Sequence, residues 1–173
     1  MTITIRSAGL DDAEAIAKIR VLSWQAGYPG LVPQAVLDAM SVANNTERTR
    51  KRMLDPALRR ADDWLAWRGD DALGWLGAGR CRDDDLQDEG VGEVVALYAL
   101  PSAWGQGVGH ALILFADDVF RSQGYGKSAV WVMQGNTRAE QFYQRQGFQF
   151  DGARRPLGMK DVPGHLRRLT KAL

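Results

Sequence analysis

A glycine-rich turn between an apolar segment and a helical pattern is the feature that most limits how this chain folds. The apolar segment runs from Val94 to Leu100, and residues 111–120 have the spacing of an amphipathic helix. Between them, the sequence PSAWGQGVGHAL has three glycines at alternate positions. Glycine lets the backbone approach a ligand closely, and the first N–H groups of a helix have no partner within it. Because the helix dipole adds positive charge there, the turn predicts a phosphate or pyrophosphate site.

Three interpretations of this turn are open. A dinucleotide-binding fingerprint has the spacing Gly-x-Gly-x-x-Gly near the start of a strand–helix–strand unit, whereas Gly105, Gly107 and Gly109 follow a long N-terminal half. A nucleotide P-loop needs Gly-Lys-Ser/Thr at the turn to meet the phosphates and magnesium, and this turn has none. The third interpretation is a helix start whose glycines serve only tight packing. The turn alone does not separate these possibilities.

Composition excludes several other classes of protein. With 173 residues, 45% of them hydrophobic and 25% charged, the chain suits one globular domain. A net charge of +1 provides no field for nucleic acid or an acidic membrane surface. Cys81 has no disulfide partner, and with His110 and His165 as the only histidines we expect no metal site. Since no apolar run reaches membrane-spanning length and the N-terminus lacks a signal-peptide pattern, a cytoplasmic protein is expected.

Periodicity and turn residues predict the order of the elements. Strands are expected at 2–6, 64–67, 73–82, 92–100, 128–133, 148–153 and 165–169. Helices are expected at 10–24, 42–54, 108–123 and 137–146, and Pro33 can start another. Antiparallel-looking strands come first, and a strand–helix–strand–helix–strand half follows. This order predicts a mixed α/β fold in one domain.

A second motif follows the strand expected at 128–133. It reads NTRAEQFYQRQGF and runs from Asn136 to Phe148. Together with Leu97-Tyr98-Ala99 and the glycine turn, it resembles the two-part cofactor signature of the GCN5-related N-acetyltransferase (GNAT) superfamily. The resemblance is strongest from Glu93 to Phe148, and the element order extends it over nearly the whole chain.

The GNAT resemblance implies a fold and a cofactor. The fold would be a single N-acetyltransferase domain over residues 1–173, with a mixed central sheet that splays at the acyl-CoA cleft. About six or seven strands would form this sheet, and about four helices would flank it. Acetyl-CoA would be the cosubstrate, with no metal.

The same resemblance implies which residues bind the cofactor. The backbone of Leu97, Tyr98 and Ala99 would pair with the pantetheine arm, which Asn136 would also reach, and Tyr143 would lie next to the sulfur. The pyrophosphate loop would comprise Gly105, Gln106, Gly107, Val108, Gly109 and His110. Two positions depart from the family pattern: Trp104 replaces a usual Gln or Arg, and Ala99 a bulkier β-branched residue. Neither departure removes a backbone donor.

Two residues are candidates for the chemistry of acyl transfer to an amine. A phenol stays protonated at neutral pH, so Tyr143 can give a proton to a departing thiolate; the alternative is a core aromatic like Phe142. A lysine-like ammonium must lose a proton at a cost of about 4.6 kcal/mol at pH 7, so a base is expected. Glu93, at the start of the strand before the loop, is the candidate, and the alternative is a solvent-facing strand residue.

The acceptor site is less defined by the sequence. Trp24 and Tyr28 lie where GNAT proteins place the helix–loop–helix that walls the acceptor pocket, and they can cover an amine by cation–π contact or simply pack. The acidic residues of 83–89 can attract a cationic amine, or they can form a solvated loop.

Three functions follow from these residues. The first is direct N-acetylation of a primary amine, in a small molecule or a peptide, with no nucleic acid or membrane partner and a homodimer as the possible assembly. The second is a catalytically silent acyl-CoA-binding module that acts as a sensor or partner-binding domain. The third is a nucleotide-binding protein, which would bind NAD or Mg-ATP but not CoA.

Overall fold

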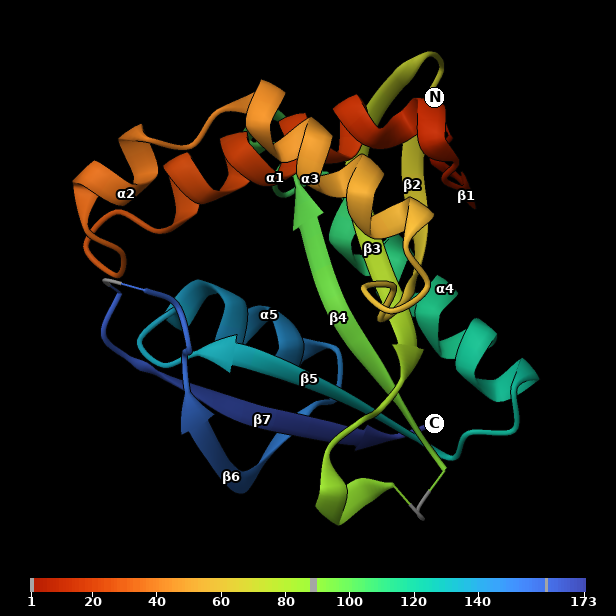
Figure 1. The fold of residues 1–173 in the computed structure, drawn as a ribbon. Coiled ribbons are helices and arrows are strands. Elements are labelled where there is room, and N and C mark those ends of the chain that lie inside the picture. The colour runs from red at the N-terminus through yellow and green to blue at the C-terminus, as the bar shows by residue number, and fades with distance from the viewer. Residues whose placement is uncertain (1, 88–89, 161) are drawn as a thin grey trace.

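In the computed structural model, which describes residues 2–87, 90–160 and 162–173, seven strands form one mixed sheet (Figure 1). The strands are β1 (Thr4–Ser7), β2 (Asp62–Arg68), β3 (Asp71–Arg80), β4 (Val91–Ala99), β5 (Lys127–Met133), β6 (Gln149–Pro156) and β7 (His165–Ala172). Their order across the sheet is β1-β2-β3-β4-β5-β7-β6. Strands β4 and β5 pair in parallel, and the other neighbouring strands are antiparallel. The expected mixed α/β class is confirmed.

Five α-helices flank the sheet within the described residues, one more than the expected four. They are α1 (Ala13–Gly27), α2 (Gln34–Asp38), α3 (Val42–Leu54), α4 (Val108–Ser122) and α5 (Thr137–Arg145). The additional helix, α2, begins directly after Pro33, whose fixed φ suits a helix start. Among the described residues, none of the helices is long and apolar enough to cross a lipid bilayer.

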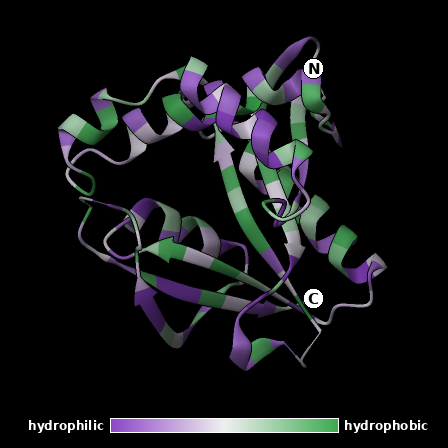
Figure 2. Ribbon diagram, viewed as in Figure 1, coloured by the Kyte–Doolittle hydropathy of each residue, from purple (hydrophilic) through white to green (hydrophobic). Residues whose placement is uncertain are grey.

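The hydrophobic core lies on both faces of the central strands. On one face, Leu112 and Phe120 of α4 are fully buried against β3 and β4. On the other face, Ile16 and Ile19 of α1 pack with Trp75 of β3. Figure 2 shows hydrophobic residues concentrated on β4 and β5, whereas α3 is largely hydrophilic. Helices α1 and α4 therefore cover opposite faces of the sheet. A cleft that passes through the sheet would be bordered by α4 on one face and by α1 on the other.

Some element boundaries differ from those expected. The hairpin turn between β2 and β3 has only Gly69 and Asp70 between the paired residues Arg68 and Asp71, and Gly69 has a φ of 59°. The expected helix at 10–24 begins as a 3₁₀ turn, because the Asp12 carboxylate accepts a hydrogen bond from the Gly9 N–H at 2.9 Å. The last strands extend further than expected, because β6 pairs with β7 as far as Pro156 and β7 pairs with β5 as far as Ala172.

The sheet opens where β4 parts from β5. Their parallel pairing covers only Val91–Val94 and the residues 127–130. At the same place Val95 is an extra residue on β4, because Val94 pairs with Ala78 and Ala96 pairs with Gly77. Such a bulge bends a strand and increases its twist, so β4 turns away from β5 here. This opening is the expected splay.

Candidate active site

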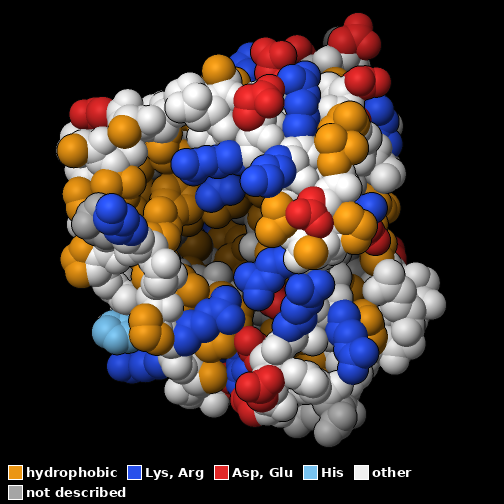
Figure 3. Space-filling model, viewed as in Figure 1, with side chains coloured by type: hydrophobic (Ala, Val, Ile, Leu, Met, Phe, Trp, Pro, Cys, Tyr) orange, Lys and Arg blue, Asp and Glu red, His pale blue; other side chains and the backbone are white. Residues whose placement is uncertain are grey.

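A deep cleft fills the opening between β4 and β5. Its volume is about 740 Å³, which is in the range of small-molecule and cofactor sites. It is lined by the loop before α4 and by α5 on one side, and by α1 with its following loop on the other. Figure 3 shows the mouth of a hollow with a hydrophobic interior and Lys or Arg side chains along its rim. The cleft therefore passes from one face of the sheet to the other.

The glycine turn presents unpaired backbone donors to this cleft. Gly105 and Gly107 have φ of 74° and 83°, values that favour glycine, and nothing lies within 4 Å of a Cβ built on either. Among the described residues, the N–H groups from Gly107 to His110 have no hydrogen-bond acceptor, as expected for the first turn of α4. Gly109 has a different role, because a Cβ there would be 3.1 Å from the ring of Phe142. Two glycines thus keep the space in front of the loop open, and the third lets α5 pack on α4.

Two residues of the loop also connect it to its surroundings. The Gln106 side chain donates to the Ser102 carbonyl at 2.7 Å and accepts from Arg68 at 2.7 Å. The Nδ1 of His110 lies 2.7 Å from the Oε1 of Gln146, at the end of α5. These contacts hold the loop from the side and leave its backbone donors to a ligand.

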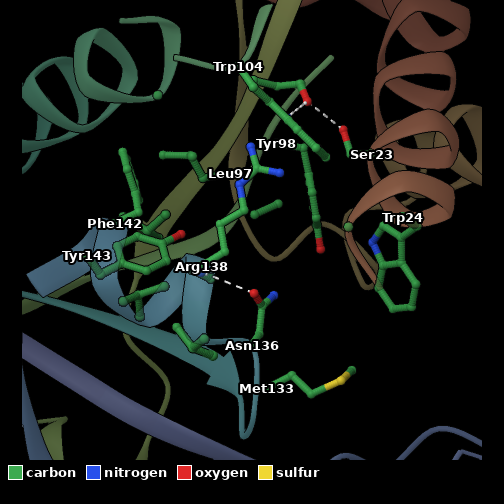
Figure 4. Close-up of a pocket in the computed structure, with 18 of the residues that line it drawn as sticks. Ser23, Trp24, Leu97, Tyr98, Trp104, Met133, Asn136, Arg138, Phe142 and Tyr143 are labelled. Carbon is green, nitrogen blue, oxygen red and sulfur yellow. Dashed lines mark hydrogen bonds between the residues drawn. The ribbon is translucent and has the colours of Figure 1, made fainter. Parts of the chain in front are cut away.

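The β4 segment of Leu97, Tyr98 and Ala99 forms one wall of the cleft. The Ala99 carbonyl accepts hydrogen bonds from the Ser23 hydroxyl and the Trp104 indole N–H, both at 2.8 Å (Figure 4). A carbonyl oxygen has two lone pairs, so this one is fully used. Any backbone contact that Ala99 makes with a ligand must then use its N–H.

Asn136 lies at the N-terminus of α5 and borders the cleft. Its Oδ1 accepts a hydrogen bond from the Ala139 N–H at 3.1 Å, which caps the helix. Its amide nitrogen points into the cleft, toward the side where Tyr98 and Trp24 lie (Figure 4). Because the helix cap fixes the oxygen, Asn136 offers the cleft a donor.

Tyr143 is buried in the wall of the same cleft, with its ring packed edge-on against Phe142 and Phe148. Its hydroxyl points toward Leu97 (Figure 4). Burial, and secondarily the neighbouring Tyr98, raise the pKa of Tyr143 above its ordinary value of 10.0. The hydroxyl therefore stays protonated at neutral pH and can act as a proton donor.

Glu93 lies outside this cleft, in a second and smaller cavity of about 200 Å³. The two cavities share wall residues, which are Val94, Val95, Trp131 and Leu166. Burial chiefly raises the pKa of Glu93, and the charge of Asp83 adds to this effect. The charges of Arg155 and Arg60 oppose it. A carboxylate with a raised pKa binds a proton more readily, so Glu93 is better suited to act as a base than an exposed glutamate.

Trp24 and Tyr28 stack on each other at the α1 end of the cleft. Their ring centroids are 4.5 Å apart and their planes differ by 16°. Both residues line the cleft, opposite the glycine turn. Burial raises the pKa of Tyr28 most, with Tyr98 and Tyr143 adding to it, so its hydroxyl is neutral.

The structure also brings together residues that the sequence motifs did not single out as a pair. The Arg138 guanidinium lies 3.2 Å above the ring of Trp104, and both side chains line the cleft (Figure 4). Loss of hydration lowers the pKa of Arg138 from its ordinary value. Trp104 departs from the family pattern at its position. Nothing in the sequence signals this contact, since the two residues belong to different motifs.

The acidic loop is partly neutralised by a buried arginine. Arg168 of β7 binds Asp83 at 3.0 Å, Asp85 at 2.6 Å and Asp151 at 2.6 Å. Asp88 and Glu89, the other end of the predicted acidic segment, lie outside the described residues. The described part of this loop is therefore anchored to the sheet rather than freely solvated.

The structure does not support several other kinds of site. A Gly-Lys-Ser tripeptide does occur at residues 126–128, but it opens strand β5 and not a helix, so it does not form a P-loop. The described residues contain no group of three or more His, Cys, Asp or Glu that could hold a metal ion. Cys81 is buried, and burial raises the pKa of its thiol to about 11, which makes it a poor nucleophile.

The cleft has the features that acetyl-CoA requires. The N–H groups at residues 107–110 and the open space before Gly105 and Gly107 suit a pyrophosphate. The opening beside β4 suits an extended arm, and Tyr143 lies deeper in the same cleft. These features define a protein of the acyl-CoA-binding class with a mixed, splayed sheet.

Comparison with known proteins agrees with this class. A profile of the acetyltransferase (GNAT) family matches residues 31–148. The chain is 28% identical over 134 residues to the uncharacterized N-acetyltransferase YuaI of Bacillus subtilis, covering 78% of this chain and 73% of that one. It is 33% identical over 118 residues to a mycothiol acetyltransferase of Geodermatophilus obscurus, covering 64% of this chain but only 38% of that longer protein.

The fold is similar to that of the PaiA N-acetyltransferase from Thermoplasma acidophilum, solved with coenzyme A. The TM-score is 0.77 at 16% identity, over 100% of both chains. Because the family profile matches more than half of its residues, the chain belongs to the GNAT family, the enzymes that transfer an acetyl group from acetyl-CoA.

Proposed function

We propose that this enzyme transfers the acetyl group of acetyl-CoA directly to the primary amine of a small molecule, and that residues 1–173 act as one N-acetyltransferase domain. The observation that supports it is a continuous cleft that joins the unpaired N–H groups before α4 to Trp24 and Tyr28 on the opposite face. Two substrates that enter from opposite faces meet at the splay. A covalent acetyl-enzyme is then unnecessary.

The cleft binds and orients the acetyl donor, which supplies a thioester carbon for attack. The backbone donors at residues 107–110 hold the pyrophosphate, and the amide nitrogen of Asn136 contacts the pantetheine arm. As the new C–N bond forms and the C–S bond breaks, the leaving sulfur takes up negative charge. Tyr143 donates its proton to that sulfur, since burial keeps the phenol protonated.

The amine must lose a proton before it attacks. For a lysine-like amine at pH 7 the cost is about 4.6 kcal/mol without assistance. We assign this proton to Glu93, whose pKa is raised by burial. Glu93 lies in the adjoining cavity and not in the cleft itself, so a water relay between the amine and the carboxylate fits this placement.

The Tyr143→Phe variant tests the role of the phenol. We expect kcat, measured as thiol release with a panel of small amines and one peptide, to fall by about 100-fold. The affinity for acetyl-CoA, measured by calorimetry, should stay nearly unchanged, because the ring still packs against Phe142 and Phe148.

The matched control is Tyr125→Phe, because Tyr125 packs against Phe120 away from the cleft. This control should retain full activity. Unchanged turnover in Tyr143→Phe would contradict the acid role. Acetyl-CoA binding by the wild type without thiol release from any amine would favour the silent acyl-CoA-binding module. A cytoplasmic location and a homodimer stay predictions.

A further inference from the structure

The smaller cavity beside Glu93 has a strongly basic wall. Three arginines line it, and they come from separate parts of the chain: Arg60 follows α3, Arg82 follows β3, and Arg155 lies in β6. Among the described residues that line it, Glu93 is the one carboxylate. Within this described lining, positive charge therefore exceeds negative charge.

Two of these guanidinium groups form no direct ion pair within the described residues, although the charge of Arg60 acts on Glu93. Among residues 2–87, 90–160 and 162–173, neither Arg60 nor Arg82 forms an ion pair. The Arg82 side chain donates only to the Arg59 carbonyl, at 3.3 Å. Each guanidinium has five N–H donors in a planar fork, so most of these donors remain available to an anion.

The third arginine is held in place but keeps free donors. The guanidinium of Arg155 lies 4.2 Å above the ring of Trp131. It also forms an ion pair with Asp83 at 3.4 Å. Asp83 also binds Arg168 at 3.0 Å and the Trp131 indole N–H at 2.9 Å. Because the negative charge of Asp83 is shared among these donors, it neutralises Arg155 only in part. The stacked guanidinium is thus preorganised toward the cavity.

The acceptor end of the main cleft, like the smaller cavity, carries positive charge and hydrogen-bond donors. Arg20 lines it, 5.7 Å from the ring of Trp24. The Trp24 indole N–H is buried and has no hydrogen-bond partner in the described part of the chain, and it points toward the cleft (Figure 4). A buried donor without a partner costs free energy that a ligand acceptor atom recovers. Both regions thus offer donors, and Glu93 is the one carboxylate in the described lining of the two cavities.

We propose that the acceptor is an amine that carries an anionic group, a carboxylate or a phosphate, and that Arg60, Arg82 and Arg155 bind this group. This proposal rests on the proposed acetyltransferase function. Because Glu93 shares the small cavity with the three arginines, the amine and the anion must lie close together in the substrate. The Lys or Arg side chains along the rim (Figure 3) disfavour polyamines and lysine-rich peptides by like-charge repulsion.

Matched pairs of amines test this proposal. The pairs are L-phenylalanine with 2-phenylethylamine, and O-phosphoethanolamine with ethanolamine, each assayed for thiol release from saturating acetyl-CoA. We expect kcat/KM to be at least about 10-fold higher for the anionic member of one pair or both. The two pairs separate a carboxylate from a phosphate. An equal or higher kcat/KM for both neutral members would overturn the proposal.

Variants test which residues recognise the anion. The double variant Arg60→Gln/Arg82→Gln should bring the ratio of kcat/KM between the anionic and the neutral member of a pair close to 1, chiefly by raising KM for the anionic amine, while acetyl-CoA binding is unaffected. Arg80→Gln removes a charge nearby on β3, outside the cavity, where Arg80 donates to the Gln87 carbonyl. This control should keep the preference. A double variant that keeps it too would overturn the assignment.

Binding distinguishes failure of this proposal from failure of the acetyltransferase function. The same four amines are titrated by calorimetry into the protein saturated with CoA. Stronger binding of an anionic member that is lost in the double variant supports the proposal, even if no thiol is released. The absence of turnover would then count only against the acetyltransferase function. Equal binding within both pairs, or no binding of any member, overturns the anion site.

Discussion

In the proposed mechanism, burial suits Tyr143 and Glu93 to opposite tasks. Burial disfavours the charged form of both, so the pKa of each is raised. For the phenol this means that it holds its proton at neutral pH. For the carboxylate it means a stronger base than an exposed glutamate. A proton donor and a proton acceptor thus border adjoining cavities.

These shifts predict the pH dependence of activity. Glu93 accepts a proton only when ionised, so kcat/KM should rise as pH increases through its raised pKa, above the ordinary 4.5. Tyr143 causes no fall below about pH 10, because its pKa lies above that ordinary value. In Glu93→Gln, the remaining rise should follow the pKa of the amine alone. Identical pH–kcat/KM profiles for Glu93→Gln and the wild type would exclude Glu93 as the base.

At the scale of the elements, glycines in β3 and β4 let helix α4 approach the sheet. A Cβ on Gly74 would lie 2.6 Å from the Cγ1 of Val108, and a Cβ on Gly92 would lie 2.4 Å from the ring of Phe120. Val108 begins α4 directly after the glycine turn. The same close packing that builds the core therefore sets the position of the backbone donors in the cleft.

The Gly92→Ala variant tests this packing. Phe120 is fully buried and cannot move without displacing its neighbours, so the free energy of unfolding should fall by about 1–3 kcal/mol. Gly126→Ala is the control, since nothing lies within 4 Å of a Cβ there and its φ is not in the left-handed region. Urea denaturation of both variants measures the difference. Equal stability of the two would show that α4 adjusts without cost.

At the scale of the whole molecule, Arg168 connects three segments that are distant in the sequence. From β7 it binds the loop after β3 through Asp83 and Asp85, and it binds β6 through Asp151. Its side chain is 5% exposed, so its charge depends on these partners. The pKa of Arg168 is raised, chiefly by its hydrogen bond to Asp85.

Arg168→Gln should therefore destabilise the whole domain. Removing this buried partner takes away the cation that Asp151 binds and leaves Asp83 with Arg155, and the loss of a buried partner of this kind costs about 3–5 kcal/mol. Arg154→Gln, at an exposed position of β6, is the matched control and should change stability little. Thermal unfolding of both variants provides the measurement. If the two variants had equal melting temperatures, the ion pairs of Arg168 would not contribute to the stability of the domain.

Much of the fold was predictable because its signals are local. The helix at 42–54 was predicted with its observed bounds, since Ser41 caps it and polar residues cover one side. For α2 the sequence indicated a possible start at Pro33 but not its extent, because five residues provide too little periodicity to recognise. The register of β6 with β7 was not predictable either, since it depends on pairing between segments and includes a bulge.

The sequence by itself determined the order of the elements, the glycine turn and the position of Tyr143 in its motif, because each depends on a dozen neighbouring residues at most. Only the tertiary structure decided where the sheet opens and which charges meet there. The splay requires pairing of β4 with both β3 and β5, and the basic cavity requires Arg60, Arg82 and Arg155 from three distant segments. Contacts of this kind form between segments that are distant in the sequence, so no short sequence pattern predicts them.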